Sequence, residues 1–256
     1  MLPNQSSTVD VGTAAATGRV HKAQKRRREI LDAAARVFYE KGYDASSTQD
    51  IAEAVGILKG SLYYYVDSKE QFLFEIIKEA HDLGLQILDE IQAAEGDVVT
   101  RFTLLIHRHV EYFAANLVKV NVFLREFQAL SLERRKDIDK LGHMYRQCVE
   151  ELVREGQSEG YISDSIDPTM VGIMVVEMLN SIARWYHAGG RATADQIADQ
   201  AATILLGGLT TPLVREELGG ENALRSQLVQ APPRAKPARK ATARKTAPRK
   251  VAANSG

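Results

Sequence analysis

The sequence predicts an all-α fold. From residue 24 to residue 209, large apolar residues recur three or four positions apart, which is the spacing of one face of an α-helix. Several of these segments follow a serine or threonine that can cap a helix, and several end close to a glycine. We find no convincing strand pattern between these segments, and no internal repeat of the length seen in solenoid proteins.

Four helices are predicted in the N-terminal part of the chain. The first covers residues 24–41, with Gly42 past its end and one apolar face made of Ile30, Leu31, Ala34, Val37 and Phe38. Two short helices follow over residues 48–55 and 59–65. The fourth begins after Ser68, because apolar residues then keep helical spacing at Phe72, Ile76, Ala80, Leu83, Ile87 and Ile91.

Five further helices are predicted over residues 98–115, 120–130, 132–159, 168–187 and 193–209. Pro168 suits the first turn of its helix. Backbone N–H groups in the first turn have no intrahelical acceptor, so a proline, which lacks an N–H group, breaks no hydrogen bond there. The Gly189-Gly190 pair ends that helix, and Thr193 can cap the last one.

The two ends of the chain lack this periodicity. Residues 1–22 are predicted to form a disordered arm, and residues 216–256 a disordered basic tail. Residues 231–256 hold eight Lys and Arg and no acidic residue; residues 19–69 hold ten basic against seven acidic residues, and residues 70–230 fifteen against twenty-five. Basic ends around an acidic middle indicate a polyanionic partner at the ends.

Composition argues against several classes of protein. Cys148 is the single cysteine, so neither an intramolecular disulfide nor a cysteine-rich metal site is expected. The start has no secretion signal, and the apolar run near residues 170–179 is broken by Glu177 and too short for a membrane span. We find no nucleotide-binding glycine loop, catalytic triad order or metal cluster. The expectation is a cytoplasmic, nucleoid-associated protein that is not an enzyme and has no cofactor.

The most informative segment is a helix-turn-helix pattern at about residues 48–67. Ser47 can cap the first helix, with Asp50 as the reciprocal partner three residues later. Gly56 permits the positive φ of a tight turn, and Ile57 and Leu62 return apolar side chains to the angle between the two helices. The second helix of such a pair reads DNA in the major groove.

Residue types on this segment suit contacts with duplex DNA. Lys59 can donate to guanine, and Gly60 lets the backbone approach closely. Hydroxyl groups can bond phosphate oxygens, and the start of the helix after Ser68 is placed for a phosphate. The alternative is that three consecutive tyrosines form a packed surface. The candidate DNA-binding residues are Thr48, Gln49, Lys59, Gly60, Ser61, Tyr63, Tyr64, Tyr65 and Lys69.

Four stretches resemble the DNA-binding domain of TetR-family regulators over about residues 25–85. They are Arg27-Arg-Glu-Ile-Leu-Asp-Ala-Ala-Ala-Arg-Val-Phe, Lys41-Gly-Tyr, Thr48-Gln-Asp-Ile-Ala and Gly60-Ser-Leu-Tyr-Tyr-Tyr-Val-Asp-Ser-Lys-Glu70. The resemblance implies an all-helical homodimer whose larger domain binds a small ligand that releases DNA. It also implies base contacts for Lys59 and Tyr64, and phosphate contacts for Thr48, Ser61, Tyr63, Tyr65 and Lys69.

The predicted organisation is therefore an N-terminal three-helix helix-turn-helix domain over residues 23–70 and a C-terminal helical ligand-binding and dimerisation domain over residues 71–215. Polar groups within apolar helices, and large apolar residues near them, are candidates for the ligand site. The alternatives are an internal ion pair or an interface for each polar residue, and plain core for each apolar one. The candidates are Phe102, Phe123, Arg125, Phe127, Met174, Glu177, Asn180, Arg184 and Trp185.

The segment Arg184-Trp-Tyr-His-Ala-Gly-Gly190 is similar to the corresponding stretch of TetR-family repressors of steroid-ring catabolism, which respond to a CoA thioester. This resemblance implies an acyl-CoA-type effector. Where those relatives carry Arg and Trp on the preceding turns, this chain has Val176 and Asn180, so a different effector stays open. A shared mode of helix packing is the alternative explanation.

Taken together, these patterns predict a sequence-specific transcriptional regulator, a repressor released from double-stranded operator DNA by a small hydrophobic or acyl-CoA-type effector. The last two helices carry an apolar face that can form a four-helix bundle with a second copy: Ile173, Met174, Ile182, Ile197, Ala201, Ile204, Leu205 and Leu209. The alternative function is a nucleoid-associated architectural protein that binds DNA through its basic tail, since mobile positive charges bind DNA without sequence preference.

Overall fold

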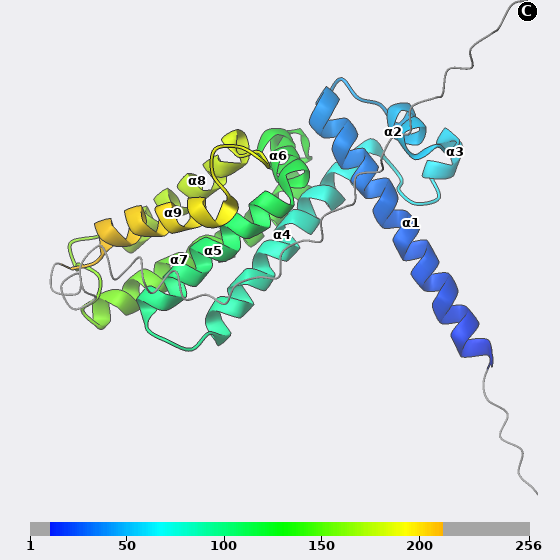
Figure 1. The fold of residues 1–256 in the computed structure, drawn as a ribbon. Helices are drawn as coiled ribbons and strands as arrows, with labels where there is room; N and C mark the ends of the chain where they lie inside the picture. The colour runs from blue at the N-terminus through cyan, green and yellow to red at the C-terminus, as the bar shows by residue number, and fades with distance from the viewer. Residues whose placement is uncertain (1–10, 212–256) are drawn as a thin grey trace, which may run out of the picture.

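The computed structural model describes residues 11–211, with side chains from residue 22 onward, and Figure 1 shows their arrangement as helices. The helices are α1 (Val11–Lys41), α2 (Thr48–Val55), α3 (Lys59–Leu62), α4 (Lys69–Ala93), α5 (Val98–Ala115), α6 (Leu117–Glu126), α7 (Leu132–Ser158), α8 (Pro168–Trp185) and α9 (Ala194–Leu209). A 3₁₀ turn, η1 (Phe127–Ala129), follows α6, and one isolated bridge pairs Ile162 with Thr210.

The predicted all-α fold is confirmed. Helices α2 and α5 have the predicted bounds, and the predicted caps are present at Ser47, Ser68 and Thr193, each of which accepts the amide hydrogen of the third residue after it. Asp167 caps α8 just before Pro168. Across residues 11–211, none of the helices combines the length and the apolar composition that crossing a lipid bilayer requires.

The largest differences from the predicted helix bounds are in α1, α3 and α6. Helix α1 begins at Val11, so the part of the predicted arm from residue 11 onward is helical; the run Ala14-Ala-Ala has the high helix propensity that explains this. Helix α3 ends at Leu62, and the chain then turns through the tyrosines so that Val66 enters the core. Helix α6 begins at Leu117 and ends at Glu126, earlier at both ends than residues 120–130. The predicted tail at 216–256 lies outside the described residues.

Helix α8 ends at Trp185, before the Gly189-Gly190 pair that was predicted to end it. The amide hydrogen of Tyr186 still bonds the carbonyl of Ile182, and the chain then becomes extended. Gly189, at φ 82°, therefore lies in the connection to α9.

Two large hydrophobic cores lie along the described part of the molecule, and α4 contributes to both. The N-terminal core joins α1, α2 and α3 to the first turns of α4, and it also takes in Val122 from α6, Leu130 after η1 and Ile138 from α7. The second core joins the remainder of α4 to α5, α7, α8 and α9. The predicted domain limit at residue 70 thus falls at the start of a helix that both cores share.

Polar contacts fasten the N-terminal core to the rest of the protein. The ammonium group of Lys119 on α6 lies 2.7 Å from an Asp32 oxygen on α1 and 3.0 Å from a Glu79 oxygen on α4. Arg27 on α1 pairs with Glu75 on α4 at 2.5 Å. Because Lys119 is largely buried and bonded to both carboxylates, it links α1, α4 and α6 at one point.

Candidate DNA-binding surface and ligand pocket

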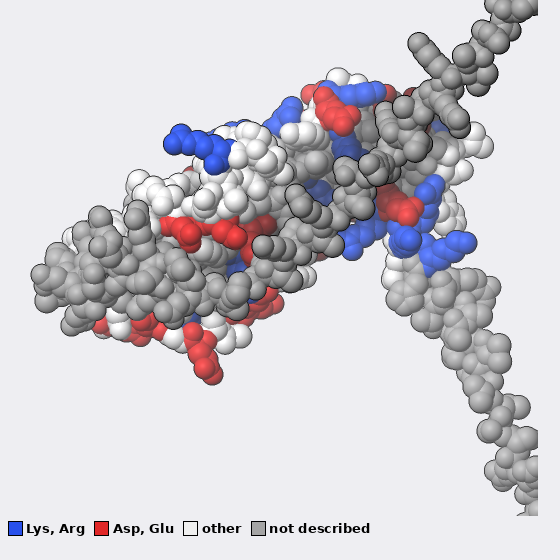
Figure 2. Space-filling model, in the orientation of Figure 1, with Lys and Arg blue, Asp and Glu red and all other residues white. Residues whose placement is uncertain are grey.

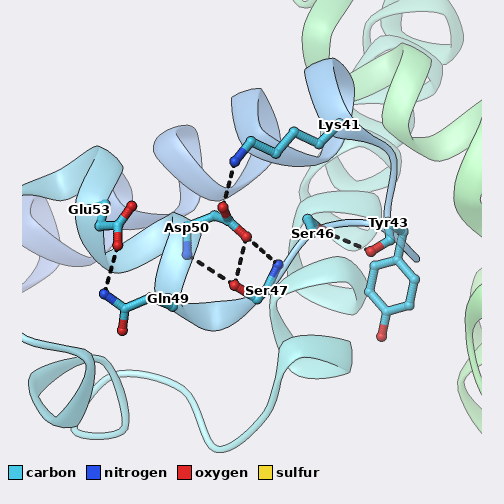
Figure 3. A network of polar contacts seen from close by, with 7 residues as sticks. All are labelled: Lys41, Tyr43, Ser46, Ser47, Gln49, Asp50 and Glu53. Atoms are coloured by element: carbon cyan, nitrogen blue, oxygen red, sulfur yellow. Dashed lines mark hydrogen bonds and ion pairs between the residues drawn. The ribbon is translucent and has the colours of Figure 1, made fainter.

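A network of polar contacts fixes the start of α2 (Figure 3). The Ser47 hydroxyl accepts the amide hydrogen of Asp50 at 3.2 Å, and an Asp50 carboxylate oxygen accepts that of Ser47 at 2.7 Å. The other carboxylate oxygen lies 2.5 Å from the ammonium of Lys41, at the end of α1. These contacts, first that of Lys41, hold the pKa of Asp50 far below its usual range, so the network stays charged at neutral pH.

The turn between α2 and α3 depends on Gly56. Its φ of 70° lies in the left-handed region, and its amide hydrogen bonds to carbonyl oxygens at the end of α2. Leu62, the last residue of α3, is fully buried in the N-terminal core. Ile57 and Val55 are partly buried against the same core. One face of α3 is thereby anchored, and the opposite face is turned to solvent.

The exposed side of α3 and the turn after it carry most of the predicted DNA-binding residues. Lys59, Gly60 and Ser61 are exposed, and Tyr64 is 86% exposed. Lys59 has no hydrogen bond or ion pair within the described part of the chain, so its ammonium is available. Leu58, at 80% exposure, is an apolar neighbour that the candidate set does not include.

The other predicted DNA-binding residues flank this face. Tyr63 is half exposed, while Tyr65 is partly buried and meets the ring of Tyr64 edge-on at 5.2 Å between centroids. At the start of α2, Thr48 is partly buried and Gln49 is exposed, with its amide donating to a Glu53 oxygen at 2.9 Å.

Lys69 differs from the other candidates because its ammonium already has a partner. It donates to the carbonyl oxygen of Tyr43 and lies 4.2 Å from the centroid of that ring. The lysine therefore ties the start of α4 to the loop after α1. An ammonium has three protons, so further hydrogen bonds remain open to it.

A cavity of about 370 Å³ lies in the larger part of the molecule, among α4, α5, α6, α7 and α8. Its lining is mostly apolar and aromatic, with a small number of polar groups, which is the usual composition of a small-molecule site. Four of the nine predicted ligand-binding residues line it: Phe123, Glu177, Asn180 and Arg184.

The other five predicted ligand-binding residues lie elsewhere. Phe102 is fully buried in the second core, and Phe127 packs against the N-terminal core. Arg125 is exposed and donates to the carbonyl oxygen of Tyr39 at 3.4 Å. Met174 and Trp185 are exposed by 64% and 54% on the outer side of α8. Helical periodicity placed these residues on α5, α6 and α8 but did not indicate which side of each helix meets the cavity.

Several cavity residues were not among the nine candidates, chiefly His81, His109, Tyr112, Tyr145 and Arg146. Burial lowers the pKa of His109 to about 3 and that of His81 to about 4, so both imidazoles are neutral at neutral pH. In each ring the Nε2 atom is buried without a hydrogen-bond partner among the described residues. A sequence signal existed for His109, because it is a polar residue within an apolar helix.

Two cavity residues carry positive charge, Arg146 on α7 and Arg184 on α8. Arg184 is exposed and Arg146 is partly buried, so this part of the lining reaches solvent. Between residues 22 and 211, neither guanidinium has a carboxylate partner within ion-pair distance. A guanidinium binds carboxylate or phosphate through two parallel hydrogen bonds.

Comparison with known proteins identifies both halves of this architecture. Residues 30–76 match the family model for bacterial regulatory proteins of the tetR family, and residues 95–209 match that for the tetracyclin repressor-like C-terminal domain. The transcriptional repressor KstR2 of Rhodococcus jostii is 32% identical over 188 residues, covering 73% of this chain and 92% of the relative. The chain belongs to the TetR family.

Solved structures of TetR-family proteins have the same fold. The ketosteroid regulator KstR2 of Mycobacterium tuberculosis aligns with a TM-score of 0.69 and 30% identity, covering 73% of this chain and 95% of that one. AibR, solved in complex with isovaleryl coenzyme A and operator DNA, aligns with a TM-score of 0.65 and 31% identity, covering 71% and 98%. The predicted resemblance to the steroid-catabolism branch is confirmed by the first of these relatives.

As a TetR-family member, the protein is a helix-turn-helix transcriptional repressor that binds DNA as a homodimer. The relatives are transcriptional regulators, and the comparisons do not support the alternative of a nucleoid-architectural protein.

The predicted dimer face of this TetR-family repressor divides into an inner and an outer set. Ile182, Ile197, Ala201 and Leu209 are buried within the protomer, so they belong to its own core, and Leu205 packs partly buried against the same core. The outer side of α8 and α9 exposes large apolar side chains instead, and it borders a groove of about 600 Å³ between the two helices. The exposed residues are Met170, Ile173, Met174, Trp185 and Ile204.

Proposed function

We propose that this TetR-family repressor reads its operator through the exposed face of α3 and the start of α2. The observation that carries the proposal is the solvent-exposed face of α3, where Lys59 is unpaired within the described residues and Tyr64 projects from a backbone anchored by Leu62. Lys59 and Tyr64 contact bases, and Gly60 admits the DNA backbone closely.

Phosphate contacts fix the register of this helix on the duplex. Hydroxyl groups supply them on both sides of the reading face, from Thr48, Ser61, Tyr63 and Tyr65. Lys69 adds a phosphate contact at the start of α4, and Gln49 reaches a base or the backbone. Two such surfaces in a dimer, spaced by about one turn of DNA, read a pseudo-palindrome.

Selection of bound sequences from a pool of random duplexes tests this reading. Wild-type protein is expected to enrich one pseudo-palindrome. Lys59→Ala is expected to lose discrimination at one base pair in each half-site, and Ser61→Ala to weaken binding evenly across sequences. Enrichment of no sequence, or an unchanged preference in Lys59→Ala, would contradict the proposal.

In the proposed domain organisation, one domain reads the operator and the other binds the ligand and the second copy. The operator-reading domain occupies residues 23–70, and the ligand-binding and dimerisation domain occupies residues 71–215. The outer faces of α8 and α9 pack against those of a second copy as a four-helix bundle. The homodimer acts on cytoplasmic, nucleoid DNA, and the effector releases it because the effector binds the DNA-free state more tightly.

The effector that suits the cavity best is an acyl-CoA thioester. A volume of about 370 Å³ is near the lower end for ligand sites, so it accommodates the acyl group and not the nucleotide part of coenzyme A. Arg184 and Arg146 provide cations that have no carboxylate partner among the described residues, where the cavity meets solvent, which suits phosphate groups that stay outside. AibR, a relative of the same fold, was solved with isovaleryl coenzyme A.

Calorimetric titration distinguishes this effector from a small uncharged hydrophobe. Isovaleryl-CoA and longer acyl-CoAs are expected to bind more tightly than either the free acids or coenzyme A, and to release operator DNA. The Arg146→Ala and Arg184→Ala variants are expected to lose affinity for the thioesters, whereas Arg154→Ala, a control on the exposed side of α7, is not. Equal affinity for thioester and free acid would favour a plain hydrophobic effector instead.

A further inference from the structure

The N-terminal half of α1 extends beyond the body of the protein. Figure 1 shows α1 passing α2 and α3 and projecting past them, at the end of the molecule away from α8 and α9. Among the side chains described from residue 22 onward, the first buried one on α1 is Ile30, and Lys22 to Lys25 are all exposed. Apart from the ion pairs of Arg27 with Glu75 and of Arg28 with Glu79, the described side chains of α1 before Ile30 add no buried contact with the body.

This projecting part is basic. Residues 11–28 contain six Lys and Arg and no Asp or Glu, in a chain whose formal net charge is zero. Arg26, Arg27 and Arg28 each have a carboxylate partner, namely Glu29, Glu75 and Glu79. Figure 2 shows Lys and Arg side chains gathered where this helix leaves the body.

Lys22 and Lys25 have no carboxylate partner in the part of the chain that the structure describes. Within residues 22–211 no hydrogen bond or ion pair reaches either ammonium group. They are three positions apart, and Arg26 is four positions after Lys22, so like charges lie side by side on the helix and repel one another. An isolated helix of this kind is only marginally stable in water, and a polyanion that neutralises it would stabilise it.

We propose that the projecting part of α1, through Lys22 and Lys25, binds the phosphate backbone of the duplex that flanks each operator half-site. The inference rests on the proposed operator reading, because α3 lies at the same end of the molecule. The part of α1 before Ile30 is about 28 Å long at 1.5 Å per residue. That length corresponds to roughly eight base-pair steps at 3.4 Å each, so the helix reaches DNA that α3 does not touch.

Duplex DNA is favoured over other partners by the composition of this segment. Residues 22–28 contain no large apolar side chain, so the segment offers a protein partner or a lipid surface little to bury. Exposed lysines on a helix suit contacts with phosphates. Such a contact requires a positive charge on a long side chain, and it does not depend on the base sequence. The contact therefore adds affinity and lengthens the protected site without changing which sequence is read.

The test uses the full-length protein and two duplexes, one limited to the operator and one with about ten further base pairs on each side. Binding is measured over a range of salt concentrations for Lys22→Gln/Lys25→Gln, and for Lys22→Arg/Lys25→Arg, which keeps both charges. A second control, Lys136→Gln/Lys140→Gln, removes two exposed charges from α7.

On the long duplex, the Gln variant is expected to bind at least tenfold more weakly at low salt. Its slope of log affinity against log salt is expected to shrink by about 0.9 for each phosphate that the lysines no longer neutralise. On the short duplex it is expected to match wild type, and both controls to match wild type on both duplexes. An unchanged slope on the long duplex, or an equal loss on the short one, would overturn the inference while leaving operator reading intact. Absence of sequence selection by wild type would instead overturn operator reading, and this inference with it.

Discussion

His109 and Tyr145 share a hydrogen bond of 2.9 Å between the imidazole Nδ1 and the phenol oxygen, at the wall of the cavity. Burial raises the pKa of Tyr145 and lowers that of His109, so both groups are neutral. The phenol hydrogen has no other acceptor among the described residues, and donating it to Nδ1 places the imidazole hydrogen on Nε2. The cavity wall therefore holds a neutral imidazole whose remaining donor is unused.

The two buried histidines predict that the protein loses stability on acidification. His109 and His81 have pKa values of about 3 and about 4 when folded, against about 6.5 when unfolded. Below pH 6.5 the unfolded chain therefore takes up protons that the folded protein does not, and this favours unfolding until pH falls through the folded values. At pH 5 each histidine is expected to cost about 1–2 kcal/mol relative to pH 7.5, since one pKa unit equals about 1.4 kcal/mol.

Urea unfolding of wild type, His109→Phe and His81→Phe at pH 7.5 and pH 5 measures this effect. Each variant is expected to lose less stability on acidification than wild type does. The exposed His187 supplies the control, because His187→Gln should follow wild type. The same loss in all four proteins would show that other groups cause the pH dependence.

Gly56 is expected to tolerate no side chain without a loss of stability. Nothing lies within 4 Å of a Cβ built at this position, so the cost of Gly56→Ala comes from the positive φ alone, about 1–2 kcal/mol. Gly60 has similarly open surroundings and sits inside α3 without a positive φ, so Gly60→Ala should leave stability unchanged or raise it by up to about 1 kcal/mol. Equal urea midpoints for the two variants would contradict this account.

The exposed apolar side chains of α8 and α9 predict the effect of a charge on dimerisation. Ile204 is 66% exposed on α9, so Ile204→Asp should leave the protomer folded while placing two carboxylates in the interface. Native mass spectrometry is expected to show monomers, with operator affinity reduced at least tenfold. Leu132, which is 71% exposed at the start of α7, provides the matched control: Leu132→Asp should remain dimeric. A stable dimer of Ile204→Asp would place the interface elsewhere.

Deletion of residues 231–256 tests the role of the basic tail. Its eight positive charges, with no acidic residue among them, are expected to raise non-specific affinity for DNA. The truncated protein should therefore bind random duplex more weakly and with a smaller salt slope, while its preferred operator sequence is unchanged. If the salt slope on random duplex is the same with and without these residues, the tail has no part in DNA binding.

The features that sequence predicts best here depend on a residue and its near neighbours. Ser47 with Asp50, and Thr193 with Gln196, form the reciprocal caps that their spacing predicts, and Gly56 takes the predicted left-handed conformation. Each of these is a local interaction within four residues of the chain. For the same reason the bounds of α2 and α5 follow directly from the sequence.

The ligand pocket was less predictable because it depends on how helices rotate against one another. Phe102 and Phe123 look alike in sequence, yet the first is fully buried in the second core and the second lines the cavity. Tyr145 and Arg146 lie on α7, whose inward side is set by contacts with α4, α5 and α8 and not by its own pattern. Met174 and Trp185 are also apolar, but they do not line the cavity. They face outward beside the groove between α8 and α9.

Helix α4 is uninterrupted over 25 residues, or about 37 Å, with its beginning in one core and its remainder beside the cavity. A rod of that length turns a small angular change into a large linear one. Tilting it by about 5° about Gly84, which lines the cavity, moves its start at Lys69 by roughly 2 Å, more than half of one base-pair step. A small tilt of α4 around Ala80 and Gly84 in each copy is thus enough to shift the proposed reading helices, the two copies of α3, away from the spacing of successive major grooves.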